Sequence, residues 1–281
     1  MGALRSAIVS RLPRPVLSRL RAAKRSLMRN WVDEAELIAS LAPTSPESFS
    51  LVLVDVGAHF GTVTTLFLDK GWSAIAYEPD PSNREQFQQR IGSHPRVQLS
   101  SAAVSDKPAE SASFFTSSVS TGVSTLAAFH ESHEPTANVN VVTLAEDLRA
   151  RKVQQVDFLK IDVEGFDYFV LKGFDWTYAP RFVLYEFEDR KTVPLGYSLH
   201  DSSAFAADRG YRLVYSVWEP IVEYGTRHRW RGLFSAPPAD VATCWGNVLC
   251  FRDEVDAARC MKRFGTSRQR MFGQVRHGFA V

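Results

Sequence analysis

Lys160, Asp162 and Glu186 are the side chains whose types and positions most directly indicate acid–base chemistry. Lys160 and Asp162 stand near the end of the apolar segment 156–163, and Glu186 lies near the end of another apolar segment. Lys160 and Asp162 share one face of a strand because side chains alternate with a period of two. Ionisable groups in a buried strand are costly unless they are paired or functional. The pattern therefore predicts a reactive site, with a structural ion pair from Lys160 to Asp162 or Glu164 as the alternative.

A glycine turn follows the first long apolar segment of this region. Residues 51–54 (LVLV) are typical of a strand buried in a parallel sheet, and Asp55 falls at its end. Gly57 and Gly61 frame a turn into a helix over residues 62–70, and glycine lets a backbone approach a ligand closely. The spacing G-x-x-x-G differs from the pyrophosphate-binding G-x-G-x-x-G and resembles motif I of S-adenosylmethionine (SAM) methyltransferases. A structural strand-to-helix turn is the alternative.

Glu78 follows the next apolar segment, Trp72 to Tyr77. It stands 17 residues after Gly61, about where a nucleotide-binding fold places the acid that binds the ribose hydroxyls. A carboxylate suits this role because it only accepts hydrogen bonds and can bind two neighbouring hydroxyls. A solvated loop acid is the alternative. NAD-binding proteins use the same kind of acid, so it is the glycine spacing that favours SAM.

The apolar segments around these residues predict an α/β fold. Two helices are expected at residues 166–172 and 201–209, and Thr143-Leu144-Ala145-Glu146 predicts a capped helix that ends near residue 152. A Ser/Thr-rich loop at 116–124 could fold over a ligand. Seven strands are expected, at residues 51–54, 72–77, 97–99, 156–165, 182–188, 211–218 and 247–252, and residues 139–142 also alternate before Thr143.

The charge distribution divides the 281-residue chain into three parts. Residues 1–30 hold eight Lys or Arg residues and residues 257–281 hold six, with no acid in either segment. The whole chain has 33 Lys or Arg residues and a net charge of +2. Residues 31–256 therefore hold 33 − 14 = 19 basic and 31 acidic residues, a net charge of −12. We predict a basic N-terminal helical arm (1–45), a catalytic domain (46–256) and a basic tail (257–281).

The arm interleaves leucines with arginines, which is typical of an amphipathic helix on an anionic membrane. Packing on the acidic domain and a transit peptide are alternatives, and residues 1–6 also fit the myristoylation pattern. No apolar run reaches the length of a membrane span. Three cysteines without zinc spacing are expected to be reduced, buried thiols. These features predict a cytoplasmic protein, and the basic arm predicts peripheral binding to the inner membrane face.

The chain resembles the FkbM-type family of SAM-dependent methyltransferases, known for O-methylation of natural products and glycans. The resemblance covers about residues 51–188. His59 stands where many members carry Asn. The matching segments are Asp55–Gly61, Glu78-Pro79, Ala102–Asp106, and most specifically Phe158–Gly165 with Leu171–Gly173 behind it.

This resemblance implies a doubly wound, mostly parallel seven-stranded sheet with SAM across the ends of its strands. The turn from Asp55 through Gly57 and His59 to Gly61 would hold the methionine part, and Glu78 would hold the ribose. Ser101, Ala102 and Asp106 would face the adenine edge, and Asp162 the methionine amine or the acceptor.

For the acceptor proton, the same resemblance points to Asp162 or Glu186, with Lys160 adjusting the local charge. His59 and His200 are weaker candidates, since a lone histidine is more often a surface or core residue. Asp162 and Glu186 could also chelate a divalent metal, which the sequence leaves undecided.

The expected function is therefore O-methylation of a hydroxyl on a glycan, glycolipid or secondary metabolite. A non-catalytic, membrane-associated SAM sensor or scaffold is one alternative, and an NAD-linked dehydrogenase is another. Residues 227–231 (RHRWR) could bind an anionic or sugar-bearing acceptor or form a solvated hairpin. We expect a small-molecule or glycan partner and no nucleic acid, and the oligomeric state is not predicted.

Overall fold

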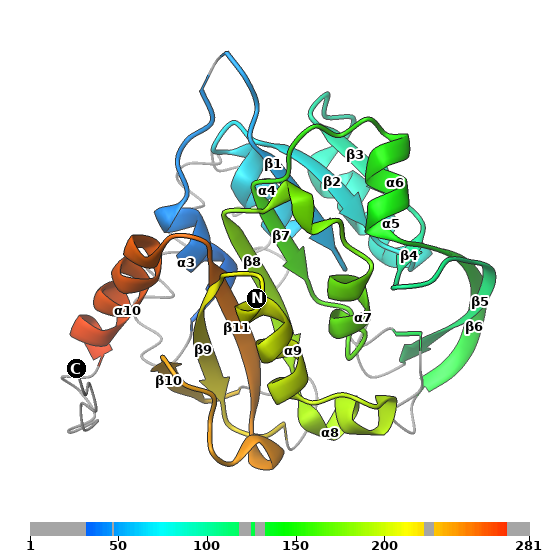
Figure 1. Cartoon of the computed structure of the whole chain (residues 1–281). Helices are drawn as coiled ribbons and strands as arrows, with labels where there is room; N and C mark the ends of the chain where they lie inside the picture. The colour runs from blue at the N-terminus through cyan, green and yellow to red at the C-terminus, as the bar shows by residue number, and fades with distance from the viewer. Residues whose placement is uncertain (1–31, 47, 118–124, 127–132, 222–227, 269–281) are drawn as a thin grey trace, which may run out of the picture. The chain divides into compact units, whose positions relative to one another are not determined.

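An eight-stranded sheet forms the centre of the fold (Figure 1). The structure is a computed structural model that describes residues 32–46, 48–117, 125–126, 133–221 and 228–268. The strands lie in the order β10-β9-β11-β8-β7-β1-β2-β3. Their bounds are β1 Val52–Val56, β2 Ser73–Tyr77, β3 Val97–Ser100, β7 Phe158–Ile161, β8 Phe182–Phe187, β9 Arg212–Trp218, β10 Trp230–Phe234 and β11 Trp245–Phe251.

The five strands from β8 to β3 are parallel to their neighbours, as the apolar segments predicted. Asp55 pairs with Lys160 in the register of β1 and β7, so both face the same side of the sheet. The carboxyl ends of parallel strands meet at one edge. Residues that follow β1, β2, β7 and β8 are therefore brought together there.

The other edge of the sheet is antiparallel and has one more strand than the predicted seven. β11 runs antiparallel to both β8 and β9, and β10 pairs antiparallel with β9. β10 begins at Trp230, within the segment that was read as an acceptor-binding insertion or a hairpin. Trp230 and Arg231 are thus part of the sheet, and the Arg231 side chain pairs with Glu219 and Asp240.

Helices cover both faces of the sheet, which makes it doubly wound. One core cluster joins the sheet to α6 (Leu144–Ala150), α7 (Asp167–Lys172) and α9 (Leu199–Ala207). The second joins it to α3 (Glu34–Leu41), α4 (Thr62–Leu68) and α10 (Glu254–Arg268). The Thr143 hydroxyl accepts a hydrogen bond from the Glu146 N–H, so Thr143 caps α6 as predicted.

α3 lies within the segment 1–45 that was expected to be an arm, and α10 extends past residue 256 into the expected tail. α3 contributes the buried Leu37 and Ile38 to the core, and α10 contributes Ala257 and Cys260. Their apolar side chains pack on the sheet, so the compact unit starts at Glu34 and continues into α10. Residues 1–31 and 269–281, where the basic arm and most of the tail were predicted, lie outside the described residues.

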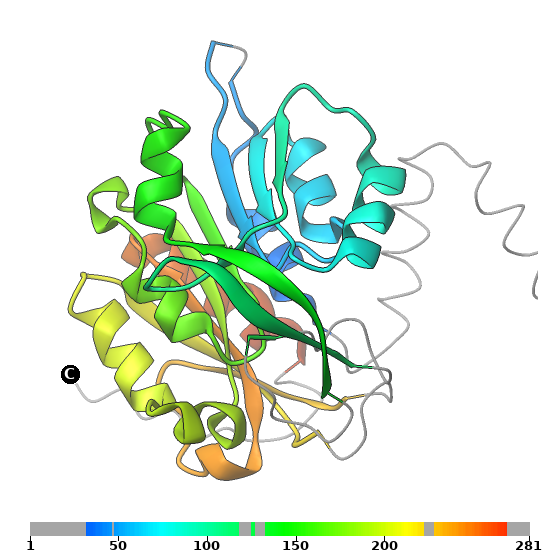
Figure 2. The same cartoon turned by 90° about the vertical axis from the view of Figure 1, so that its right-hand side faces the viewer.

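A second, three-stranded sheet was not predicted as such. It has the order β4-β6-β5, with β4 Ala103–Val104, β5 Ala109–Ser117 and β6 His133–Val142. β5 and β6 form a long ribbon in front of the main sheet (Figure 2). Phe114 on β5 is buried in a small cluster with Ala103, Val139 and Val141. The predicted Ser/Thr-rich loop begins at the end of β5, and its residues 118–124 lie outside the described part of the chain.

Within the described segments, we found no helix with the length and apolar character that a membrane crossing requires.

Candidate active site

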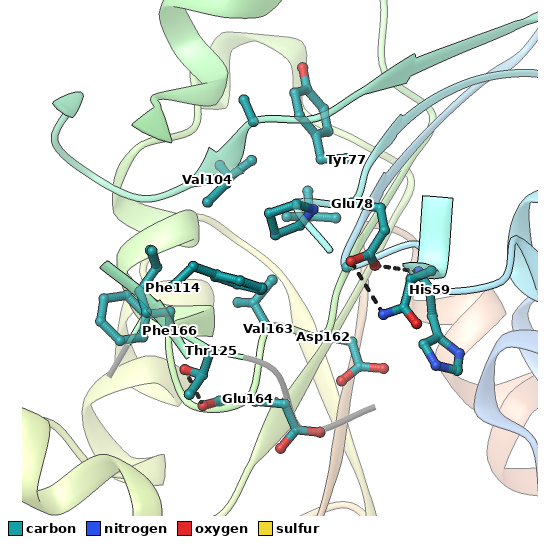
Figure 3. Close-up of a pocket in the computed structure, with 17 residues that line it drawn as sticks. His59, Tyr77, Glu78, Val104, Phe114, Thr125, Asp162, Val163, Glu164 and Phe166 are labelled. Carbon is teal, nitrogen blue, oxygen red and sulfur yellow. Dashed lines mark hydrogen bonds between the residues drawn. The ribbon is translucent and has the colours of Figure 1, made fainter. Parts of the chain in front are cut away.

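A pocket lies where β1, β2 and β7 end, and the small sheet forms part of its wall (Figure 3). It combines acidic groups with an apolar surface. Five of the predicted site residues line it: Gly57, His59, Glu78, Ala102 and Asp162. The other lining residues are Val56, Tyr77, Pro79, Asn83, Ala103, Val104, Phe114, Thr125, Leu126, Val163, Glu164 and Phe166.

The glycines of the turn after β1 are required because other parts of the protein approach them. Gly57 has a φ of +74°, and a Cβ there would lie 1.9 Å from the backbone oxygen of Asp162. Gly61 has a φ of +72°, and its Cβ would lie 2.7 Å from the ring of Phe87. Left-handed backbone is rare for other residues. Gly57 therefore lets the ends of β1 and β7 meet at the pocket, whereas Gly61 is not part of its lining.

Glu78 is held in place at the end of β2 by N–H groups. Its Oε2 accepts a hydrogen bond from the His59 backbone N–H at 2.7 Å. Its Oε1 accepts from the Asp80 N–H at 2.9 Å and from the Asn83 side chain at 3.4 Å. A carboxylate has about four acceptor positions, so capacity for a ligand hydroxyl remains. Burial raises the pKa of Glu78, and these hydrogen bonds oppose that shift.

His59 acts on Glu78 through its backbone. Its φ is +48°, in the left-handed region where Asn, Asp and His are enriched. The ring stacks on Phe60, and burial lowers the pKa of His59. His200, the other histidine considered as a base, is exposed on α9 and does not line the pocket.

The apolar part of the pocket suits a flat ring. Figure 3 shows Phe114, Phe166 and Val104 on the side of the pocket opposite Glu78 and His59. Ala102 joins this wall. Ser101 is exposed and does not line the pocket. Asp106 also lies outside the lining and forms an ion pair with Lys172 at 3.0 Å.

Asp55 and Lys160 lie beneath the glycine turn and not in the pocket wall. The Lys160 ammonium lies 3.3 Å from Asp55 and 3.6 Å from Asp162, and it donates to the Gly57 carbonyl at 2.6 Å. The Thr64 hydroxyl donates to the other Asp55 oxygen. Burial lowers the pKa of Lys160, but the charges of Asp55 and Asp162 outweigh this effect. The pKa is therefore raised overall, and Lys160 stays charged. This buried pair ties the turn to Asp162.

Acidic side chains gather around Asp162. The Asp162 side chain is 50% exposed and that of Glu186 is 8% exposed. Oxygen atoms of Asp162, Glu164 and Glu186 lie within 4.8 Å of one another. Glu164, which the site prediction did not include, has a φ of +55°, and its carbonyl accepts a hydrogen bond from Thr125 at 3.3 Å.

Three carboxylate oxygens at this spacing could bind a divalent cation. However, the Lys191 ammonium already lies 2.5 Å from Glu164 and 3.6 Å from Glu186. It also lies 2.9 Å from Glu188. A cation that belongs to the chain itself therefore already faces Glu164 and Glu186.

Burial raises the pKa of several of these acids. The pKa of Glu186 lies well above its usual value because the side chain is buried, although Lys191 opposes the shift. Burial and the charge of Asp162 raise the pKa of Asp167 to about 7. Asp167 accepts hydrogen bonds from the Gly165 and Glu186 backbone N–H groups. At neutral pH such acids can hold or release a proton.

The pocket fits SAM in its chemistry. Glu78 offers acceptors for ribose hydroxyls, the apolar wall offers a surface for adenine, and Asp162 offers negative charge for the cationic end. The residues that sequence analysis missed are Phe114 on β5, Thr125, which forms an isolated bridge to Phe115 of that strand, Asn83 and Lys191. Only the spacing Glu78-x-x-x-x-Asn83 lies close enough in sequence to have offered a signal.

The comparisons agree with this geometry. The model of the methyltransferase FkbM domain matches residues 55–213, more than half of the chain. The search of the curated proteins found no match.

Solved structures with a similar fold are distant. Precorrin-6y C5,15-methyltransferase from Geobacter metallireducens is 11% identical, with a TM-score of 0.41 over 77% of this chain and 86% of that one. Magnesium protoporphyrin IX methyltransferase from Synechocystis PCC 6803, solved with bound SAM, is 11% identical with a TM-score of 0.40 over 78% and 76%. An rRNA methylase from Streptococcus thermophilus is 9% identical, with a TM-score of 0.38 over 78% and 93%. Such weak likenesses do not identify an acceptor. It is the match to the family model that shows that this chain belongs to the FkbM methyltransferase family and is a SAM-dependent methyltransferase.

Proposed function

We propose that the protein transfers a methyl group from SAM to a hydroxyl of a glycan, glycolipid or secondary metabolite. The observation that carries this proposal is the position of Asp162. Its half-exposed carboxylate lines the pocket, and the oxygens of Glu164 and Glu186 lie within 4.8 Å. A hydroxyl that accepts a methyl group must lose a proton, and a group of carboxylates is suited to receive it.

Different residues bind the cofactor and handle the acceptor proton. When bound, SAM supplies an activated methyl group on a positively charged sulfur. Gly57, His59 and Glu78 orient the cofactor, while Ala102 and the apolar wall contact its base. Asp162 aligns the acceptor hydroxyl and takes its proton, and Glu186 behind it shares that proton. Lys160 keeps Asp162 in place through the buried pair with Asp55.

The acidic character of this side of the pocket supports an acceptor without a phosphate backbone. The half-exposed Asp162 carboxylate would repel the phosphates on which nucleic-acid binding depends. A neutral sugar or alcohol meets no such repulsion.

Calorimetry and thermal shift with SAM test the cofactor part. SAM at about one hundred times its Kd should raise the free energy of unfolding by about 2.7 kcal/mol. No heat and no shift at millimolar SAM would contradict the proposal.

Mass spectrometry tests the acceptor part. Extracts of cells with and without the protein should contain pairs of compounds that differ by one methylene group. Binding of SAM with no such pair, and with no methyl transfer to any extract, would instead favour the sensor or scaffold. Membrane association remains a prediction for residues 1–30, and vesicle binding that disappears on their removal would support it.

A further inference from the structure

Lys191 occupies the centre of the carboxylate group beside the pocket. It lies on α8 (Asp189–Thr192), immediately after β8, and only 3% of its side chain is exposed. Its Nζ lies 2.5 Å from Glu164, 2.9 Å from Glu188 and 3.6 Å from Glu186. An ammonium has three N–H donors, so it can face all three carboxylates at once.

The chain brings these partners together from separate segments. Glu186 and Glu188 come from β8 and its end, whereas Glu164 comes from the turn after β7. The left-handed backbone at Glu164, with a φ of +55°, is unfavourable for a residue other than glycine. Such a conformation persists only where its surroundings fix it, and here the ion pair with Lys191 and the hydrogen bond from Thr125 do so.

The positive charge of Lys191 also opposes the effect of burial on the pKa of its partners. Burial raises the pKa of Glu164 and of Glu186, and for both the largest opposing influence is Lys191. The other nearby lysine, Lys160, is paired with Asp55 and Asp162. Among the described residues, no other ammonium or guanidinium forms an ion pair with Glu164 or Glu186, so without Lys191 these two buried carboxylates would face one another without a cation.

We infer that Lys191 is a positioning residue of the methyl-transfer site, whose ammonium gathers Glu164, Glu186 and Glu188 beside Asp162 where a divalent cation would otherwise be needed. This inference rests on the proposed function, because Glu186, one of the acids that Lys191 holds, shares the acceptor proton with Asp162 in that proposal. It acts through them and does not line the pocket. It differs from a metal in being part of the chain and always present.

A Mn²⁺ titration followed by electron paramagnetic resonance tests the inference without any acceptor. The wild-type protein should bind no Mn²⁺ at the cluster at millimolar metal, because the ammonium takes that place. Lys191→Ala should gain one Mn²⁺ site, and the double variant with Glu186→Gln should lose it again. Binding of Mn²⁺ by the wild-type protein that Glu186→Gln abolishes would overturn the inference, as would no gain in Lys191→Ala.

Methyl transfer provides the second readout. Labelled SAM is incubated with an extract of cells that lack the protein. Lys191→Ala should lower kcat at least about tenfold while KM for SAM changes less than about threefold, and Lys191→Arg should restore part of the loss. Equal kcat in wild type and Lys191→Ala, or a change in KM alone, would contradict the positioning role.

Arg190→Ala is the matched control. Arg190 is the preceding residue of α8 and pairs with Glu188 at 2.8 Å, but its side chain is 59% exposed. Glu188 keeps its ion pair with Lys191 in this variant, and an exposed guanidinium contributes little, so Arg190→Ala should stay within about twofold of the wild type. If the wild type transfers no label to any extract, the proposed function fails, whereas the Mn²⁺ titration still decides the role of Lys191.

Discussion

The two acidic ends of the pocket are built in different ways. At one end, the Glu78 carboxylate accepts hydrogen bonds from N–H groups of His59, Asp80 and Asn83. At the other end, Asp162 belongs to a group of carboxylates that pair with Lys160 and Lys191. N–H donors fix a carboxylate in one orientation, as a ribose-binding acid requires. Ammonium groups allow several acids to share charge, as proton transfer requires.

The largest expected effect comes from Gly57→Ala, which would push the two ends apart. The Gly57 N–H donates to the carbonyl of Tyr77, the residue before Glu78. A Cβ added at Gly57 would lie 1.9 Å from the backbone oxygen of Asp162. The clash and the positive φ should lower the free energy of unfolding by about 3 kcal/mol or more. Urea unfolding measures this. Gly92→Ala is the control, since Gly92 also has a positive φ but open space around it; an equal loss in both variants would show that the close approach is unimportant.

Asp162→Asn should affect the proton-handling end alone. We expect kcat to fall about 100-fold, equivalent to about 2.7 kcal/mol, because the amide cannot take the acceptor proton. The melting temperature should change little, since the side chain is half exposed. Kinetics and thermal unfolding are compared in the same preparation. Equal damage to folding and turnover would favour a structural Lys160–Asp162 pair.

Glu78→Ala should affect the orienting end alone. Loss of the acceptor for the ribose should weaken SAM binding at least tenfold, or about 1.4 kcal/mol. Isothermal titration measures the affinity. Glu85→Ala, an exposed acid on α5 (Pro81–Ile91), is the control and should bind SAM normally. Unchanged binding in Glu78→Ala would remove Glu78 from the cofactor site.

Asp167→Asn should change the pH dependence of stability. The pKa of Asp167 is about 7 in the folded protein against an ordinary 3.8, so between these values the folded state holds the proton more tightly than the unfolded state. Its contribution to stability is therefore greatest below about pH 4 and is lost as the pH rises through 7. Urea unfolding across this range should show that the free energy of unfolding declines less with pH in Asp167→Asn than in the wild type. The difference between the two slopes should be at most about 1.4 kcal/mol per pH unit. Parallel curves for the two proteins would contradict this.

The sequence predicted the main sheet and the part of the site that depends on short motifs. Gly57, Glu78 and Asp162 directly follow apolar strands, and parallel strands end at one edge, so their convergence could be expected. The small sheet was missed because β5 lacks a clear alternating pattern over Ala109–Ser117. The predicted contacts of Ser101 and Asp106 remain untested, although neither lines the pocket.

Local patterns thus determined the strands of the main sheet other than β10, the position of the glycine turn and the acids at the strand ends, because these follow from side-chain periodicity and turn chemistry. Only the tertiary structure decided which charges meet. Lys160 is buried against Asp55, and Lys191 reaches Glu164 from 27 residues away. Such pairs depend on how turns after neighbouring strands fold over one another, and a burial-dependent charge state has no signature in the residues themselves.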